Sequence, residues 1–225
     1  YTHPAHWSDE LTAAIAECPK VARYVDIPLQ HISDNMLDAM QRVTDGDYIR
    51  TLLRNIRKAV PGIAIRTTFI TGFPGETEAH VLETLEVVRS LPLTYAHVFP
   101  YSARPGTVAA ELPDQVGKAV RQERAARVRA VVEAKREAFW KDTLTCERLL
   151  VALDCNEDAG SASGQHGVDE CYVPCRLRTP LRPGLAAGQQ YGQQYGQSRM
   201  FFRFSHRFPF YRLSGFRLSR GFPPP

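Results

Sequence analysis

Short apolar runs rich in β-branched and aromatic residues alternate with amphipathic helical patterns along the first 145 residues of the chain. The three clearest runs are residues 23–29, 63–70 and 95–101, which lie about 35 residues apart. Continuous apolar runs are typical of parallel strands that are buried on both faces, and parallel strands are joined by helical crossovers. The pattern therefore predicts an α/β fold in which three parallel strands alternate with helices.

The segments between these runs carry apolar residues at helical spacing and begin at residues that favour helix N-caps. Helices are predicted to begin at Ser8, Ser33, Asp47 and Thr77, and a longer helix is predicted over residues 118–143, with its Arg and Lys side chains facing outward. The apolar positions of these helices are expected to form the core, and we assign no chemistry to them. These positions are Leu11, Ile15, Cys18, Met36, Leu37, Met40, Ile49, Leu52, Leu53, Ile56, Val60, Val81, Leu82, Leu85, Val88, Val120, Val128, Val131, Val132 and Phe139.

The composition of the chain changes after residue 145. Residues 149–153 are expected to open a small, incomplete β domain that covers residues 146–178. Residues 179–225 are of low complexity, with a Gly-Gln-Gln-Tyr repeat followed by mixed Phe and Arg, and we expect this tail to be disordered. From Arg176 onward there are nine Arg, no Lys and no acidic residue, so the net charge of +4 arises from the tail alone.

The apolar runs and the cysteines bear on where the protein works. No window holds eighteen uninterrupted apolar residues, and residues 1–7 lack the basic and apolar regions of a secretion signal, so we expect no membrane partner. The chain begins with Tyr rather than Met, which suggests a piece of a longer protein. Five widely spread Cys residues favour a reducing compartment over a disulfide framework. Cys171 and Cys175 lack further ligands nearby, so no metal ligands are predicted.

The loops that follow the carboxyl ends of parallel strands converge at one edge of the sheet, where binding sites form. In this chain these loops are residues 28–31, 71–77 and 100–107, and all three are rich in Gly, Pro and polar residues. The sequence therefore predicts a binding site at this edge.

The loop at residues 71–77 is the most informative of the three. Pro74 and Gly75 fit the central positions of a type II turn, and Gly72 removes a side chain where the strand ends, so a flat ligand can lie against this backbone. A phosphate is disfavoured because Glu76 occupies the helix start, where an anion would bind. The alternative is an ordinary β-α turn with a capping Thr.

Four polar residues on or after the strands are candidates for ligand contacts. Gln30 and His31 are suited either to hydrogen bonding a ligand or to satisfying neighbouring backbone groups. Arg66 is costly to bury unpaired, so we expect a carboxylate partner, which is either Asp26 in a structural pair or a group on a substrate. His97 is expected to be a satisfied interior histidine rather than a ligand.

Five segments occur in a specific order and spacing: residues 24–34, 40–42, 65–77, 99–102 and 105–107. Together they resemble the radical SAM methylthiotransferases. The resemblance implies that residues 1–145 form the later strands of a radical SAM partial (β/α) barrel, followed by a degraded small β domain of the TRAM type, which grips the substrate. It also implies the use of S-adenosylmethionine and two 4Fe-4S clusters to replace a C–H bond with C–S–CH3.

The same resemblance implies roles for individual residues. It assigns no catalytic residue in this chain, and Arg66 and His31 stay candidates for substrate contacts on the physical grounds given above. The C-x3-C-x2-C run that holds the reducing cluster in this family is absent, so neither cluster would be ligated by this chain. The residues that would lie along S-adenosylmethionine are Gln30, Gly72, Phe73, Pro74, Gly75, Glu76, Phe99 and Tyr101.

Within the family, residues 26–31 and 66–70 resemble the type that modifies an aspartate of protein twelve of the small ribosomal subunit. A ribosomal protein or the ribosome is therefore the expected partner. Residues 97–107 are closer to the branches that modify a tRNA adenosine, which makes tRNA the alternative substrate. The expected location is the cytoplasm, or an organellar stroma or matrix in a eukaryote.

Two functions of other kinds stay open. The basic helix and the Arg- and Phe-rich tail fit a catalytically inert module that binds RNA or docks on the ribosome. The loop between Gly72 and Gly75 fits another α/β-barrel enzyme that uses a phosphorylated substrate.

Overall fold

The computed structural model of the 225-residue chain describes residues 2–143, 148–154, 166–169, 171, 174–176 and 199–205. The chain divides into two compact units, Tyr1–Leu144 and Thr145–Pro225. Each unit is described by itself, beginning with the first.

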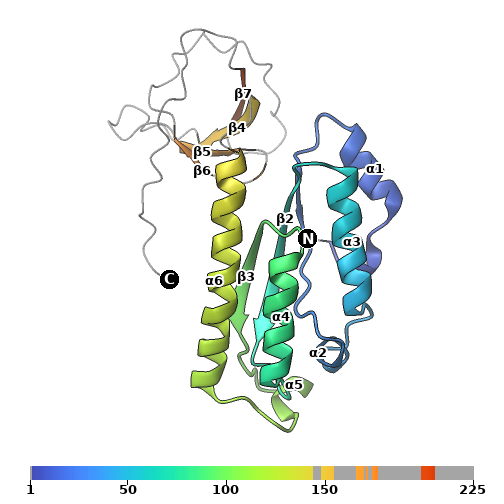
Figure 1. Ribbon diagram of the computed structural model, residues 1–225, viewed down its shortest axis with the longest axis vertical. Coiled ribbons are helices and arrows are strands. Elements are labelled where there is room, and N and C mark those ends of the chain that lie inside the picture. The colour runs from blue at the N-terminus through green and yellow to red at the C-terminus, as the bar shows by residue number, and fades with distance from the viewer. Residues whose placement is uncertain are drawn as a thin grey trace. The chain divides into compact units, whose positions relative to one another are not determined.

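A three-stranded parallel sheet organises the first unit (Figure 1). Its order is β1 (Tyr24–Asp26), β2 (Ala64–Thr71) and β3 (Tyr95–Pro100), so strands that follow one another in the chain are neighbours in the sheet. Helices connect these strands, which confirms the predicted α/β fold with parallel strands. Because all three strands point the same way, their carboxyl ends meet at one edge.

Most helices of the first unit begin where the sequence predicts. The Ser8 hydroxyl caps α1 by accepting a hydrogen bond from the Leu11 amide. The predicted start of α3 at Asp47 is wrong, because the Asp45 carboxylate accepts from the Tyr48 amide and the helix begins one residue after Asp45. The short α5 was not expected. The helices are η1 (Pro4–His6), α1 (Asp9–Glu17), α2 (Asp34–Ala39), α3 (Gly46–Ala59), α4 (Glu78–Ser90), α5 (Val108–Glu111) and α6 (Lys118–Thr143).

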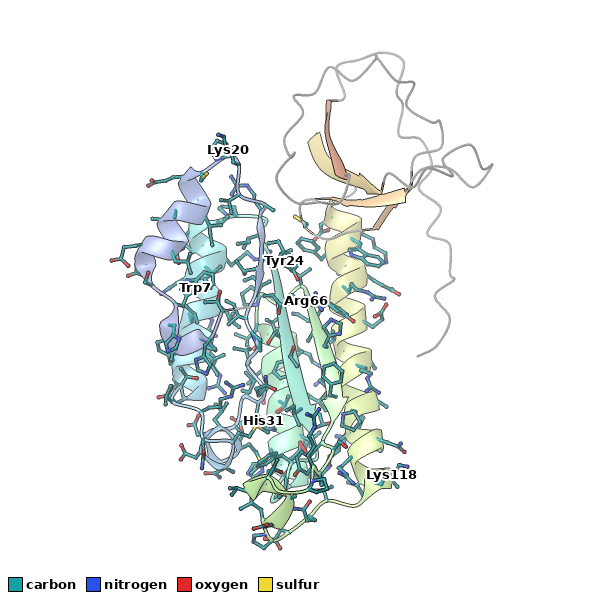
Figure 2. The ribbon with its side chains drawn as sticks, turned by 180° about the vertical axis from the view of Figure 1, so that it is seen from behind. Trp7, Lys20, Tyr24, His31, Arg66 and Lys118 are labelled. Atoms are coloured by element: carbon teal, nitrogen blue, oxygen red, sulfur yellow. The ribbon has the colours of Figure 1, made fainter. Side chains whose placement is uncertain are left out.

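The two faces of the sheet differ in character. Alternate residues of β2 are buried on one face, where Ile65 and Phe69 join the core with apolar residues of α3, α4 and α6. Residues of the opposite face, such as Arg66, Thr68 and Ile70, are only half-buried. Figure 2 shows this open face toward the viewer, with Arg66 and Tyr24 on it. The open face is available to a ligand or to another segment of protein.

Two residues expected in the core lie at the surface instead. Leu82 is 54% exposed because the buried stripe of α4 follows Val81, Leu85 and Val88, and a residue adjacent to Val81 points about 100° away. Val120 is also exposed, since it lies in the first turn of α6, whereas the buried positions of that helix begin at Arg124 and Ala125.

The second unit contains a four-stranded antiparallel sheet with the order β6-β5-β4-β7. Its strands are β4 (Arg148–Asp154), β5 (His166–Asp169), β6 (Pro174–Arg176) and β7 (Arg199–Ser205). The strand predicted at residues 149–153 is β4. Strand β7 falls inside the tail for which no fold was expected; its Phe-rich sequence favours a strand, and it pairs with β4 over the whole length of β4. The remainder of the tail lies outside the described residues.

Of the helices that the structure describes, none is both long enough and apolar enough to cross a membrane.

Replacing Phe69 with Ala tests whether the covered face of β2 holds the first unit together. Phe69 is 1% exposed, so truncation should lower the free energy of unfolding by about 3–5 kcal/mol through the cavity it leaves. The matched control is Leu82→Ala, which should change the free energy of unfolding by less than about 0.5 kcal/mol because Leu82 lies at the surface. Urea unfolding followed by circular dichroism measures both values. Equal losses would contradict the assignment of the two faces of α4 and β2.

Candidate functional site

The carboxyl ends of the three strands bring the predicted binding loops together. A parallel bridge joins Gln30, after β1, to Phe69 of β2. The Tyr101 amide, after β3, donates to the carbonyl of Thr71 over 2.8 Å. These contacts extend the ladder past the strands and place Gln30, the loop after Thr71 and Tyr101 at one edge. We call this region the carboxyl edge.

Gln30 is held in a backbone conformation that residues other than Gly rarely adopt. Its φ is +73°, which costs on the order of 1–2 kcal/mol for a residue with a Cβ. Two backbone hydrogen bonds of 2.8 Å hold it there, from the Gln30 amide to the Thr68 carbonyl and from the Ile70 amide to the Gln30 carbonyl. Such conformations cluster where a side chain must be presented to a ligand. The half-buried Gln30 amide group is therefore a candidate contact at the carboxyl edge.

The turn after β2 has the predicted form. The Glu76 amide donates to the Phe73 carbonyl over 2.9 Å, and Gly75 has a φ of +81°, as a type II turn requires at its third position. The Gly75 amide donates to the Asp114 carbonyl over 3.0 Å, which fixes the turn from outside. A Cβ added at Gly75 would meet only the methyl group of Met36, at 3.9 Å, so this side of the turn is open.

Gly72 is needed for a different reason from the one predicted. A Cβ at this position would lie 2.1 Å from Cγ of Arg121, so the aliphatic stem of Arg121 occupies the space where a flat ligand was expected. The Arg121 guanidinium continues to Tyr101, where Nη1 donates to the carbonyl over 2.6 Å and the group lies 5.8 Å from the ring centre. Arg121 therefore joins α6 to the loops after β2 and β3.

Glu76 faces inward rather than along the outside of the loop. It is 5% exposed, and its Oε2 accepts from the Gly72 amide and lies 3.3 Å from Nη1 of Arg124. Arg124 Nη1 also donates to the Glu76 carbonyl over 2.8 Å. Oε1 lies 3.6 Å from Nε2 of His31. Glu76 thus shapes the turn through internal contacts.

His31 is buried and has both ring nitrogens engaged. The Ser33 amide donates to Nδ1 over 3.0 Å, which places the ring proton on Nε2, the atom that faces Glu76. His31 is 1% exposed, so it hydrogen bonds with neighbouring protein groups rather than with a ligand at the surface. It supports the loop after β1 from within.

Aromatic rings complete the carboxyl edge. Phe73 and Tyr101 meet edge to face with ring centres 5.2 Å apart. The Tyr101 hydroxyl is buried and finds no hydrogen-bond partner among the described residues, so it has a donor and acceptor to offer to a bound group. Phe99 is 54% exposed on the open face, which is unusual for a side chain of its size. A hollow of about 360 Å³ opens beside Tyr101 and is lined by Pro100, Tyr101, Ser102, Ala103, Lys118, Arg121 and Gln122.

Arg66, unlike His31, is not at the carboxyl edge. It lies opposite Asp26 and Tyr95 in the sheet, well before β2 ends at Thr71, and Figure 2 shows it well separated from His31. Its Nε lies 3.4 Å from Oδ2 of Asp26, which confirms the predicted carboxylate partner. The structure therefore does not bring together Arg66 and His31, the two residues predicted to contact the substrate.

Two residues of this edge, Arg121 and Arg124, were not among the predicted site residues. The Arg side chains of α6 were expected to face outward, which is wrong for both, because Arg124 is 8% exposed and Arg121 covers Gly72. Arg121 and Arg124 lie three residues apart, in helical spacing with Val128 and Val132, which are buried. This spacing in the sequence indicates that both Arg residues lie on the inward face of α6.

The carboxyl edge is suited to binding and orienting a planar ligand. Gln30 supplies an amide group, and Phe99 supplies an exposed ring on the open face. Within the described part of the chain, no cluster of three or more His, Cys, Asp or Glu side chains is arranged to hold a metal ion. The described residues therefore offer ligand contacts and no metal ligands at this edge.

Comparison with known proteins first gives a match to a broad class. Residues 1–88 match the family model described as the Radical SAM superfamily. This stretch contains β1, β2, the turn from Gly72 to Glu76 and most of α4.

Curated relatives give a narrower similarity. The chain is 76% identical over 116 residues to "Ribosomal protein uS12 methylthiotransferase RimO" of Akkermansia muciniphila, covering 52% of this chain and 26% of that protein. It is 56% identical over 181 residues to the protein of the same name from Opitutus terrae, covering 79% and 38%. It is also 46% identical over 132 residues to "tRNA-2-methylthio-N(6)-dimethylallyladenosine synthase" of Mycobacteroides abscessus, covering 59% and 26%.

These matches confirm the predicted resemblance to the radical SAM methylthiotransferases, and within them to the type named for ribosomal protein uS12. The chain spans between about a quarter and two fifths of the length of these curated relatives. Use of S-adenosylmethionine and an iron-sulfur cluster accompanies the radical SAM class.

Replacing Gly72 with Ala tests the close approach of Arg121. Gly62 serves as the matched control, because its φ of +81° resembles the +72° of Gly72 but nothing lies within 4 Å of a Cβ there. Gly62→Ala should lower the free energy of unfolding by about 1–2 kcal/mol, the cost of the backbone conformation alone. Gly72→Ala should cost about 1–3 kcal/mol more, from overpacking against Arg121.

Chemical denaturation measures the free energy of unfolding of each single variant and of the double variant Gly72→Ala with Arg121→Ala. Removing the Arg121 side chain should recover the excess cost at Gly72. Identical losses for Gly62→Ala and Gly72→Ala would show that Arg121 does not lie against Gly72.

Proposed function

We propose that this chain is the part of a radical SAM methylthiotransferase that frames the cofactor and the substrate. In the complete enzyme, a C–H bond of an aspartate in a ribosomal protein of the small subunit is replaced by C–S–CH3. The observation that carries this proposal is the convergence of Gln30, the turn from Gly72 to Glu76, and Tyr101 at the carboxyl edge, within a chain whose relatives are named for that reaction.

The residues of the carboxyl edge fit S-adenosylmethionine. The exposed ring of Phe99 offers a stacking surface for the adenine, and the amide of Gln30 offers both a donor and an acceptor. The unpartnered hydroxyl of Tyr101 is the kind of buried polar group that a bound cofactor satisfies. When bound, the cofactor supplies the means to abstract hydrogen from an unactivated carbon.

The residues between Gly72 and Glu76 keep the edge in shape for this ligand. Phe73 packs against Tyr101, Pro74 and Gly75 form the turn, and Glu76 holds the Gly72 amide. Two 4Fe-4S clusters belong to the complete enzyme, and neither is ligated by this chain. We infer that their cysteines are contributed by other parts of the complete protein.

The same proposal assigns a role to each part of the chain. Residues 1–145 supply the later strands of the barrel, and residues 146–178 supply a TRAM-like β domain that grips the substrate. The antiparallel pairing of β4 with β5, and of β5 with β6, supports a β domain there. Residues 179–225 form the tail. The enzyme works in the cytoplasm, or in an organellar stroma or matrix.

A tRNA adenosine is the second candidate substrate. The relative from Mycobacteroides abscessus, which is named for a tRNA reaction, supports this alternative.

The proposal is tested with the full-length protein, reconstituted anaerobically with its iron-sulfur clusters. Gln30→Ala and Phe99→Ala should each weaken the binding of S-adenosylmethionine about tenfold, because each removes a contact worth on the order of 1–2 kcal/mol. Val43→Ala is the control, since the Val43 side chain is 80% exposed. Isothermal titration calorimetry measures the affinities.

Mass spectrometry of the products identifies the substrate. When the enzyme is incubated with ribosomal protein uS12, one aspartate of uS12 should gain one methylthio group. When it is incubated with tRNA, the tRNA should stay unmodified. Product on tRNA alone would favour the second candidate. The contrary result is that the protein binds no S-adenosylmethionine and binds RNA with an affinity that falls steeply as salt is raised. That result would contradict both methylthiotransferase functions and favour the inert RNA-binding module.

A further inference from the structure

A cluster of four polar side chains lies on the open face of the sheet, away from the carboxyl edge. Tyr24 and Asp26 come from β1, Arg66 from β2 and His97 from β3. The Tyr24 hydroxyl lies 3.4 Å from Oδ2 of Asp26, and Nη1 of Arg66 donates to the same hydroxyl over 3.1 Å. Nη2 of Arg66 contacts Nε2 of His97. We call these four residues the face cluster.

The face cluster is distinct from the cofactor site. In the register of the sheet, Arg66 pairs with Asp26, whereas the carboxyl edge begins at the bridge between Gln30 and Phe69. A strand rises about 3.3 Å per residue, so the two regions are separated by on the order of 10 Å along β2. Figure 2 shows Arg66 and Tyr24 together on the open face and His31 apart from them.

His97 offers a hydrogen-bond donor to the open face. An Arg guanidinium has donors only, so Nε2 of His97 accepts from Arg66 and the ring proton lies on Nδ1. Burial lowers the pKa of His97, the Arg66 charge lowers it further, and Asp26 opposes both, so the ring is neutral at pH 7. His97 therefore presents a fixed Nδ1–H donor.

Asp26 offers an unfilled hydrogen-bond acceptor in the same cluster. Its side chain is only 10% exposed, and Oδ2 is engaged by Tyr24 and Arg66. Oδ1 is buried and has no hydrogen-bond partner in the part of the chain that the structure describes. A buried carboxylate oxygen without a donor is unfavourable, and a ligand N–H would satisfy it once a side-chain rotation opens access.

We propose that the face cluster binds the backbone of one extended residue of the protein substrate, with the N–H of that residue donating to Asp26 and its carbonyl accepting from His97. In an extended strand the N–H and the C=O of one residue face the same side, so this donor and acceptor are presented together. The inference rests on the proposed function and names the part of the enzyme that recognises a protein substrate.

The charge of the face cluster favours a peptide over a nucleic-acid backbone. The negative charge of Asp26 balances the positive charge of Arg66, and His97 is neutral, so these residues carry no net positive charge with which to neutralise a phosphate. An aromatic row leads from the cluster toward the carboxyl edge, because His97 contacts Tyr95 at 5.1 Å and stacks on Phe99 at 6.0 Å between ring centres. A bound segment that follows this row reaches the cofactor site.

Two variants of the full-length, cluster-loaded enzyme test this inference. Asp26→Asn removes the carboxylate acceptor, and His97→Phe keeps a ring between Tyr95 and Phe99 while removing the donor. Each should raise KM for ribosomal protein uS12 about tenfold, the effect of losing one hydrogen bond. The dissociation constant of S-adenosylmethionine should be unchanged. Glu78→Gln, which breaks the exposed ion pair of Glu78 with Arg127, is the control and should leave KM unchanged.

The outcomes separate this inference from the proposed function. An unchanged KM for the protein substrate in both variants would overturn the role of the face cluster, as would an equal loss of affinity for S-adenosylmethionine, which indicates general disruption. An increase in KM only for tRNA would also overturn it, in favour of a nucleobase. If the parent enzyme modifies neither substrate, the proposed function fails, and fluorescence anisotropy with labelled uS12 still shows whether the two variants weaken binding.

Discussion

The buried carboxylate of Glu76 is the contact on which the carboxyl edge depends. A carboxylate taken out of water is costly unless its oxygens are filled, and here the Gly72 amide, Arg124 and His31 surround it. These partners come from the loop after β2, from α6 and from the loop after β1, so one side chain ties three segments together. Once Arg124 fixes α6, Arg121 lies over Gly72 and reaches Tyr101. The shape of the proposed cofactor site thus follows from one buried acid and the basic residues around it.

The unequal faces of the sheet explain why polar chemistry gathers on one side. Helices bury one face of β2 around Phe69, and this packing provides the stability that permits costly features elsewhere. At the carboxyl edge Gln30 keeps a φ of +73°, and on the other face Asp26 keeps a buried oxygen that no described residue fills. Such features persist where the surrounding structure holds them in place, and they are typical of binding sites. The proposed cofactor contacts therefore gather at the carboxyl edge, and the proposed substrate contacts lie on the open face.

The sequence was sufficient for the fold of the first unit where local pattern decides the structure. Residues 118–143 form one helix as predicted, because no Pro or Gly interrupts its spacing, and the turn at Pro74 and Gly75 follows from its turn residues. Contacts between residues far apart in the sequence could not be predicted from local pattern. The partner of Glu76 is Arg124, which lies 48 residues later, so the inward direction of both charges depends on tertiary packing. Arg66 could be paired with Asp26 because a buried charge requires a partner, but its distance from His31 depends on the register of the sheet.

Amide hydrogen exchange at the turn after β2 tests the role of Glu76 most directly. In Glu76→Gln, the amides of Gly72 and Gly75 should exchange faster than in the parent chain, because the charge that accepts from Gly72 and binds Arg124 is gone, while the β2 amide of Phe69 should keep its rate. Glu86→Gln, an exposed change on α4, provides the reference. Faster exchange confined to the turn supports the account. Exchange rates for Glu76→Gln equal to those of Glu86→Gln would contradict it, because the turn would then hold its shape without the buried carboxylate.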